Sequence, residues 1–315
     1  MKSSESSDKI KKDDTSILVS IIVPTYKRGN AYLKRCIISL LNQTHKNIEI
    51  IIIDDNALND EHSKKTVSII NELKDKGNII YIKTEKNLRA ALSRNLGIFA
   101  AKGDYITFLD DDDVYLPKKI SIQLDYMQKE KLDMSFTDIG LYNEKDKLVD
   151  YRKHDYVKSK KNEDLIKLHV MHNLTGTPTY MFKAKSLKQI GGFDNFLLSE
   201  EYYLMEKAIS SGLKIGYLPG SYVKAYRHNE GGESFSNRKI TGEKELYKVK
   251  KSYFNLLNNS EKRYTRCRYF SVLAVSYYRR KNYFMFLSYS ALALLGSPIT
   301  LIKEILKYKR NISRL

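Results

Sequence analysis

Residues Tyr105–Pro117 read YITFLDDDDVYLP, so four consecutive aspartates directly follow a short apolar run. That run, Tyr105–Leu109, is rich in β-branched and aromatic residues, which predicts a buried strand. Adjacent carboxylates raise one another's pKa unless a positive charge lies among them. A divalent cation supplies such a charge, because Mg²⁺ binds one or two carboxylates together with substrate phosphates. The alternative is a solvated acidic turn that leads into the helix after Pro117.

Upstream of this run, short apolar segments alternate with segments of helical periodicity. The predicted strands are 18–24, 48–53, 79–83 and 105–109, and the predicted helices are 32–43, 67–73 and 90–101. Each strand is too apolar to have a solvated face, which is typical of a parallel sheet covered by helices on both sides. Ligands of such sheets bind beyond the carboxyl ends of the strands. Both acidic clusters, Asp54 with Asp55 and Asp110–Asp113, are expected at that edge.

The second half of the chain is less regular. We expect a strand at Met134–Leu141, an edge strand at Thr179–Phe182 and a helix over Ser199–Ser211, with Ser199 as its N-cap. After Asn237 the pattern changes to helical stretches rich in tyrosine. These stretches are 244–257, 264–278 and 283–295.

The length of 315 residues, with 42% hydrophobic residues, predicts one α/β domain with a smaller appended unit. We expect a disordered leader over residues 1–16, the main domain over 17–237 and a basic, tyrosine-rich helical region over 238–315. The leader is polar and of mixed charge, which is not typical of a secretory signal. The two cysteines, Cys36 and Cys267, are far apart in the sequence, which argues against a disulfide framework and a structural zinc site.

The formal charge of +18 is concentrated in the C-terminal region. From Ser236 to Leu315 there are 18 Lys and Arg residues but 4 Asp and Glu residues, which leaves a net charge of +4 for the remainder. A nucleic-acid-binding protein would interleave basic residues with aromatic residues over the whole fold. We therefore expect no nucleic acid among the partners.

The C-terminal region contains a stretch without charged residues, Tyr283–Ile302. Its length would suffice to span a bilayer, but Gly296, Ser297 and Pro298 would break a spanning helix. We expect a helical hairpin on the main domain, with the basic segments Arg279–Lys281 and Lys303–Arg310 facing anionic lipid headgroups. The expected location is cytoplasmic and peripheral, at the inner face of the cell membrane. The alternative is a solvated basic face without a partner.

Five segments together resemble the motifs of family 2 glycosyltransferases. The segments are VSIIVPTYKR (19–28), IIIDDNALND (51–60), LSRNLGIFAAKGDYITFLDDDD (92–113), FLDDDDVYLP (108–117) and GGFDNFLLSEEYYLMEKA (191–208). They occur in the family's order, which is more specific than any one of them. The resemblance implies a GT-A fold, which is α/β and Rossmann-like with a mostly parallel central sheet, here followed by the C-terminal helices.

The resemblance also implies roles for individual residues. The implied metal ligands for Mn²⁺ or Mg²⁺ are Asp112 and His228. The implied nucleotide-binding residues are Thr25 and Asp55 at the base with Asp54 beside them, Arg94 near the nucleotide, Asp111 near the ribose and Asp110 in support. The alternatives are a simple turn at Asp54–Asn56 and a salt-bridged helix residue at Arg94. Because the family's closing motif would place its histidine one position later, His228 has a plain surface histidine as its alternative.

The same resemblance implies Glu201 as the catalytic base, at the place of an Asp in the family's pair of acids. Glu is one methylene longer than Asp, so this is a departure from the family pattern. The alternative is that Glu200 and Glu201 are first-turn acids favoured by the helix dipole.

The expected function is therefore inverting transfer of a sugar from a nucleotide-diphosphate donor, with UDP favoured by the acid after the second strand. The expected acceptor is a saccharide or lipid-linked glycan, of the exopolysaccharide or teichoic-acid type. One alternative is a nucleotidyltransferase, which would need a glycine-rich phosphate loop that Pro24–Asn30 does not resemble. Another alternative is a basic protein that binds nucleic acid or a membrane surface.

Overall fold

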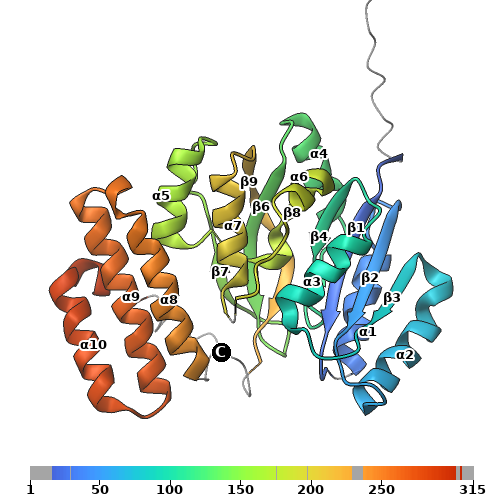
Figure 1. Cartoon of the computed structure of the whole chain (residues 1–315), viewed down its shortest axis with the longest axis horizontal. Coiled ribbons are helices and arrows are strands. Elements are labelled where there is room, and N and C mark those ends of the chain that lie inside the picture. Colours follow the sequence, from blue (N-terminus) through green and yellow to red (C-terminus); the bar gives the residue numbers. More distant parts are fainter. Residues whose placement is uncertain are drawn as a thin grey trace, which may run out of the picture.

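The computed structural model describes residues 16–28, 30–174, 176–196, 198–228, 237–302 and 306. The leader expected over residues 1–16 lies outside these ranges except for Ser16. The described strands form one mixed nine-stranded sheet with the order β3-β2-β1-β4-β8-β6-β9-β5, and β7 pairs with β6 (Figure 1).

The first half of the sheet is parallel, as the alternation of strands and helices predicts. Its elements are β1 (Val19–Thr25), α1 (Asn30–Leu41), β2 (Ile48–Asp54), α2 (Glu61–Leu73), β3 (Ile79–Lys83), α3 (Arg89–Ala100) and β4 (Tyr105–Phe108). The strand β1 pairs in parallel with both β2 and β4, and β2 pairs in parallel with β3. The carboxyl ends of these strands therefore lie at one edge of the sheet.

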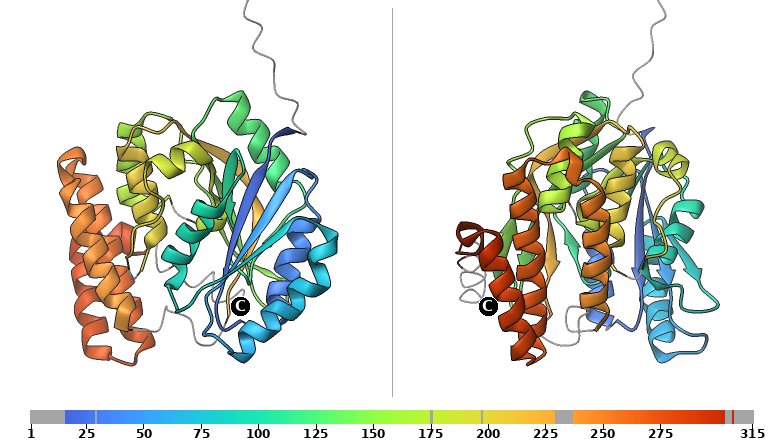
Figure 2. Two further views of the ribbon diagram at one scale, coloured as in Figure 1. Left: turned by 45° about the vertical axis from the view of Figure 1, so that its right-hand side comes forward. Right: turned by 60° about the vertical axis from the view of Figure 1, so that its left-hand side comes forward.

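Alternate residues of the buried strands enter two separate cores. Ile22 of β1 and Ile51 of β2 pack in a core with residues of α3 and α7, whereas Ile21 and Ile50 pack in a second core with residues of α1 and α4. Because successive side chains of a strand point to opposite faces, an apolar run without alternation buries both faces of the sheet. Helices accordingly cover both faces in the two turned views (Figure 2).

The second half of the sheet mixes parallel and antiparallel pairs. Its elements are β5 (Val114–Tyr115), α4 (Lys119–Lys129), β6 (Met134–Tyr142), β7 (Leu148–Arg152), α5 (Asn162–His172), β8 (Met181–Lys183), α6 (Ala184–Gln189), α7 (Glu200–Ser210) and β9 (Ile215–Tyr226). The short β5 and the long β9 were not expected from the sequence. Their pairing brings the segment after the acidic run against the far end of β9.

The structure corrects two local expectations. The edge strand expected at Thr179–Phe182 is the strand β8, which lies inside the sheet between β4 and β6 and pairs antiparallel with both. Thr179 itself belongs to a 3₁₀ turn. A proline within a strand is typical of an edge strand, but Pro178 lies in this turn, before β8 begins. Ser199 stands at the N-cap position of α7 but has a φ of 61° and makes no side-chain cap hydrogen bond.

The C-terminal helices α8 (Asn237–Ser252), α9 (Asn259–Arg279) and α10 (Tyr283–Gly296) stack at the edge of the molecule beside α5 (Figure 1). The change from sheet to helices falls near the boundary expected at residue 237. The helix α9 begins with a capping box between Asn258 and Glu261. Among the described residues, no helix is long and apolar enough to cross a membrane.

Candidate active site

The acidic run lies at the carboxyl end of β4, next to the end of β1. The Thr25 hydroxyl donates to Asp111 Oδ2 at 2.6 Å, and Arg28 Nε donates to Asp111 Oδ1 at 3.0 Å. Arg28 also pairs with Asp112 Oδ2 at 3.0 Å. One arginine from the loop after β1 therefore holds two consecutive carboxylates of the run.

Asp112 is also in contact with the end of β9. His228 Nε2 lies 3.0 Å from Asp112 Oδ2, and His228 Nδ1 lies 3.2 Å from Glu144 Oε1. The His228 ring packs edge-on against Tyr32, with the ring centroids 5.0 Å apart. Arg35 donates to the backbone carbonyl of Asp112 at 2.7 Å. The structure thus brings together the two residues expected to bind a metal, which are 116 positions apart in the sequence.

Arg94 joins the acidic run to the beginning of α7. Its guanidinium donates to Asp110 Oδ1 at 2.6 Å and to Glu200 Oε1 at 2.9 Å. The Arg94 side chain is 5% exposed, so its guanidinium is desolvated, which strengthens its bonds to the two carboxylates. Arg94 therefore fixes the position of α7 relative to the run.

A cavity of about 330 Å³ lies beside these contacts. Its lining combines Asp110 and Asp113 from the run with Glu200 and Glu201 from α7, and α8 contributes Lys239. Burial, and then the negative charge of Glu200, raises the pKa of Glu201 to about 7. The candidate base and the acidic run thus face the same space.

Three of the four carboxylates of the run have raised pKa values, chiefly because they are buried. Burial raises the pKa of Asp111 to about 6, although Arg28 and Thr25 act in the opposite direction. Burial and then Asp110 raise the pKa of Asp112. Asp113 is buried and accepts a hydrogen bond from the Tyr226 backbone N–H at 2.9 Å, which ties the run to β9.

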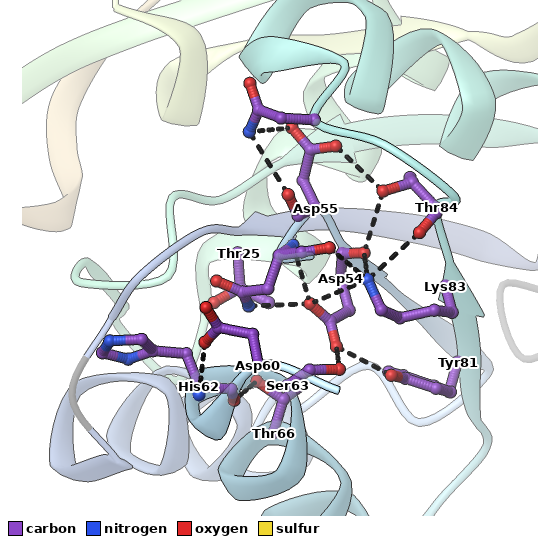
Figure 3. Close-up of polar contacts among 12 residues, drawn as sticks. Thr25, Asp54, Asp55, Asp60, His62, Ser63, Thr66, Tyr81, Lys83 and Thr84 are labelled. Carbon is purple, nitrogen blue, oxygen red and sulfur yellow. Dashed lines mark hydrogen bonds and ion pairs between the residues drawn. The ribbon is translucent and has the colours of Figure 1, made fainter. Parts of the chain in front are cut away.

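The Asp54 and Asp55 pair forms a separate hydrogen-bonded network (Figure 3). Asp54 is fully buried, and its carboxylate accepts hydrogen bonds from Ser63 at 2.6 Å and from Tyr81 at 2.7 Å. Asp55 accepts from Thr84 at 3.0 Å. These contacts use the carboxylate oxygens to connect β2 with α2 and with the loop after β3.

Asp55 also holds the beginning of α3. Its carboxylate accepts hydrogen bonds from the backbone N–H groups of Leu88 at 2.7 Å and Arg89 at 2.8 Å, and from the Asn87 side chain at 3.0 Å. The Asp55 backbone N–H donates to the Thr25 carbonyl at 2.9 Å, so this network adjoins the acidic run. The expected roles of Asp54 and Asp55 at a nucleobase stay predictions, and both residues have a structural role in addition.

Within the described ranges, no group of three or more His, Cys, Asp and Glu side chains is arranged to hold a metal ion. Asp112 and His228 offer two protein ligands, which is compatible with an ion that takes its remaining ligands from phosphates and water. Arg28, Arg35 and Glu144 were not expected at this site from the sequence. Arg28 lies in the quoted segment VSIIVPTYKR, and its charge within the loop after β1 was the available signal.

A family profile and several known proteins match parts of this chain. The profile of Glycosyl transferase family 2 matches residues 20–190. An uncharacterized glycosyltransferase of Methanocaldococcus jannaschii is 33% identical over 209 residues, which cover 66% of this chain and 70% of that protein. The UDP-Glc:alpha-D-GlcNAc-diphosphoundecaprenol beta-1,3-glucosyltransferase WfaP of Escherichia coli is 42% identical over 132 residues, which cover 42% of this chain and 49% of that protein.

The chain spans less than half of the length of the E. coli protein and of a similar uncharacterized glycosyltransferase of Haemophilus influenzae. Among solved structures, S. aureus TarS 1-349 in complex with UDP-GlcNAc superposes with a TM-score of 0.59 at 16% identity, over 89% of this chain and 92% of that chain. At this identity the likeness shows a common fold. The chain therefore belongs to glycosyl transferase family 2 and is a glycosyltransferase.

Proposed function

We propose that this enzyme transfers a sugar from a UDP-sugar to a saccharide or lipid-linked glycan, with inversion at the anomeric carbon. The observation that carries the proposal is the cavity that Asp110 and Glu201 line together. An acceptor hydroxyl in this cavity would form its bond to the anomeric carbon while the bond to the diphosphate breaks. The proton of the hydroxyl would pass to a single base, which is all that inversion requires.

Glu201 suits the role of base better than Glu200. The Glu200 carboxylate is engaged by Arg94 at 2.9 Å, so a protein donor already occupies one of its oxygens. Glu201 has a pKa of about 7 because it is buried beside Glu200. A carboxylate with this pKa is substantially ionised near neutral pH. A catalytic base is most effective when its pKa lies near the working pH.

Asp112 and His228 are the residues proposed to hold Mn²⁺ or Mg²⁺. Their donor atoms already lie 3.0 Å apart, and burial, followed by the negative charge of Asp110, raises the pKa of Asp112. A bound divalent ion would neutralise charge that develops on the leaving diphosphate. Arg28 is 34% exposed and can supply further positive charge to the diphosphate.

The proposed nucleotide contacts are those that the family resemblance implies. Asp111, which accepts a hydrogen bond from Thr25, would lie next to the ribose, and Thr25 would contact the nucleobase together with Asp55. Arg94 and Asp110 would support the nucleotide-binding residues through their ion pair of 2.6 Å.

The names of related proteins support the substrate classes. The E. coli relative is named for transfer from UDP-Glc to α-D-GlcNAc-diphosphoundecaprenol, and TarS was solved with UDP-GlcNAc. Both support a UDP-sugar as the donor. The first supports a lipid-linked acceptor, which would place the enzyme at the inner face of the cell membrane.

Two measurements test the proposal. A thermal-shift screen of nucleotide sugars with and without Mn²⁺ is expected to show stabilisation by a UDP-sugar that depends on the metal. Donor hydrolysis by the wild type, Glu201→Gln and the neighbouring Glu200→Gln is then compared. The proposal expects Glu201→Gln to bind the donor normally but to lose far more activity than Glu200→Gln. Equal activity of Glu201→Gln and wild type would remove Glu201 as the base.

A further inference from the structure

The outer face of α10 carries apolar side chains that the described part of the chain leaves exposed. Phe284 is 78% exposed, Leu287 65% and Leu295 83%. Beyond the helix, Ile299 is 70% exposed and Ile302 is 55% exposed. Within α10 the spacing of three to eight residues keeps Phe284, Leu287 and Leu295 on one helix face. Exposed apolar side chains that share one face are typical of interaction sites.

A basic turn, Arg279–Lys281, joins α9 to α10 at one end of this face. Arg280 and Lys281 are exposed, and Lys281 has a φ of 60°. Asn282 follows as the N-cap of α10 and accepts a hydrogen bond from the Met285 backbone N–H at 3.1 Å. The cap defines where α10 begins and so fixes the basic residues next to its apolar face.

Two tyrosines flank the turn, Tyr278 at 50% exposure and Tyr283 at 56%. The turn also borders a cavity of about 280 Å³, lined by Ile240, Thr241, Tyr277, Arg280 and Asn282. A guanidinium, a hydroxyl and an amide in one small hollow are groups that bind phosphate oxygens. The turn therefore brings basic side chains and polar groups suited to phosphate next to exposed tyrosines and the apolar face of α10.

The position of the turn relates it to the active site. The turn between α9 and α10 lies at the same end of the molecule as the carboxyl ends of β1 and β2 (Figure 1). The two turned views agree with this placement (Figure 2). The acidic run follows β4, which is parallel to β1, so the run opens toward this end as well.

We propose that the α10 surface, formed by Arg280, Lys281, Tyr283, Phe284 and Leu287, docks on an anionic lipid bilayer, with a headgroup phosphate in the adjacent cavity. Clusters of basic residues beside tyrosine and large apolar residues are typical of helices that lie in the membrane interface. A second copy of the chain would not explain the excess positive charge of the region. A nucleic acid would leave the apolar face uncovered. The inference does not rest on the identity of the base or the metal.

The test is flotation of the full chain with vesicles of phosphatidylcholine and phosphatidylglycerol, compared with vesicles of phosphatidylcholine alone. Each positive charge at the surface of an anionic membrane contributes about a fivefold gain in affinity, so Arg280→Gln with Lys281→Gln should weaken binding about 25-fold. Phe284→Ser should weaken it by about tenfold. Binding of the wild type should fall as salt is added.

Matched controls come from surfaces outside α10. Lys64→Gln with Lys65→Gln removes two exposed charges of α2, and Phe99→Ser removes a phenylalanine that is 86% exposed on α3. Both controls should bind vesicles as the wild type does. The proposal is overturned if the wild type ignores the anionic vesicles, or if the α10 variants and the controls bind equally well. A dimer in sedimentation that Phe284→Ser dissociates, without vesicle binding, would assign the face to a second copy of the chain.

Discussion

The two acidic clusters of this enzyme follow β2 and β4, the strands on either side of β1 in one sheet, yet their carboxylates are compensated in different ways. At Asp54, burial alone would raise the pKa, but hydrogen bonds from Ser63, Tyr81 and Asn56 outweigh it and lower the pKa. At Asp111 the ion pair with Arg28 and the Thr25 hydrogen bond do not offset burial, and the pKa rises to about 6.

This difference separates structural from functional carboxylates. A buried carboxylate whose oxygens all receive protein donors is stable without a ligand, and its removal leaves those donors unsatisfied. A group of carboxylates that remains short of positive charge is stabilised by a ligand that supplies it. The cavity is bordered by carboxylates of the acidic run, which belong to this second group. Among them, the Asp110 side chain is 38% exposed and so is accessible to a ligand.

The largest effect is expected at the edge of the second cluster, for Glu201→Gln. The variant keeps the shape of the side chain but cannot accept the acceptor proton, so kcat should fall about 100- to 10,000-fold. The measurement is steady-state transfer or donor hydrolysis at saturating donor. An unchanged donor affinity would show that the loss lies in the chemical step, and a retained kcat would contradict the assignment.

The pH dependence sharpens the same assignment. Because the pKa of Glu201 is raised to about 7, the wild-type rate should rise about tenfold per pH unit below that value and level off above it. A raised carboxylate pKa also means that the fold loses stability as the pH rises from the unfolded-state pKa of Glu201 to its folded-state pKa, and the loss is complete above the latter. Glu201→Gln should therefore have a higher Tm than the wild type at about pH 8 and a similar Tm below about pH 4. A flat rate profile across neutral pH would contradict this.

Asp112→Asn is expected to lower kcat/KM about 100- to 1,000-fold, because it weakens the charge stabilisation of the leaving diphosphate. Its stability should change little or increase, since the variant removes one of several repelling carboxylates. Activity assays across a Mn²⁺ titration, together with thermal unfolding, measure both effects. A large loss of stability would place Asp112 with the structural carboxylates instead.

Asp54→Ala should show the opposite pattern. The substitution leaves the buried donors of Ser63, Tyr81 and Asn56 without their acceptor, which costs about 3 kcal/mol of unfolding free energy. Since the folded pKa of Asp54 is lowered, its stabilisation is present above the unfolded pKa and is lost as the pH falls below it. The deficit should shrink below about pH 4 in urea unfolding experiments. A full-sized deficit at low pH would contradict the role of the ionised carboxylate.

Local sequence patterns predicted the first half of the fold because its strands bury both faces and its helices alternate with them. The pair Asp112 and His228 was expected from the family motifs, and the structure places their side chains 3.0 Å apart. The interior position of β8 was not predictable, since a three-residue strand beside Pro178 gives no sign of its neighbours. Arg28 was missed for a similar reason: which carboxylates an arginine meets depends on contacts between residues more than 80 positions apart.

The smallest effect is expected for His228→Gln, which tests whether the end of β9 belongs to the functional cluster. Glutamine can still donate a hydrogen bond to Asp112 but is a poor ligand for Mn²⁺, so the apparent metal affinity should fall about tenfold. Glu144→Gln is the matched control, because Glu144 meets the other ring nitrogen at 3.2 Å and would only orient the ring. It should lower the metal affinity less than His228→Gln. If both variants respond to Mn²⁺ as the wild type does, His228 is a surface histidine that stabilises Asp112 by charge, and the metal site must be completed by phosphate and water.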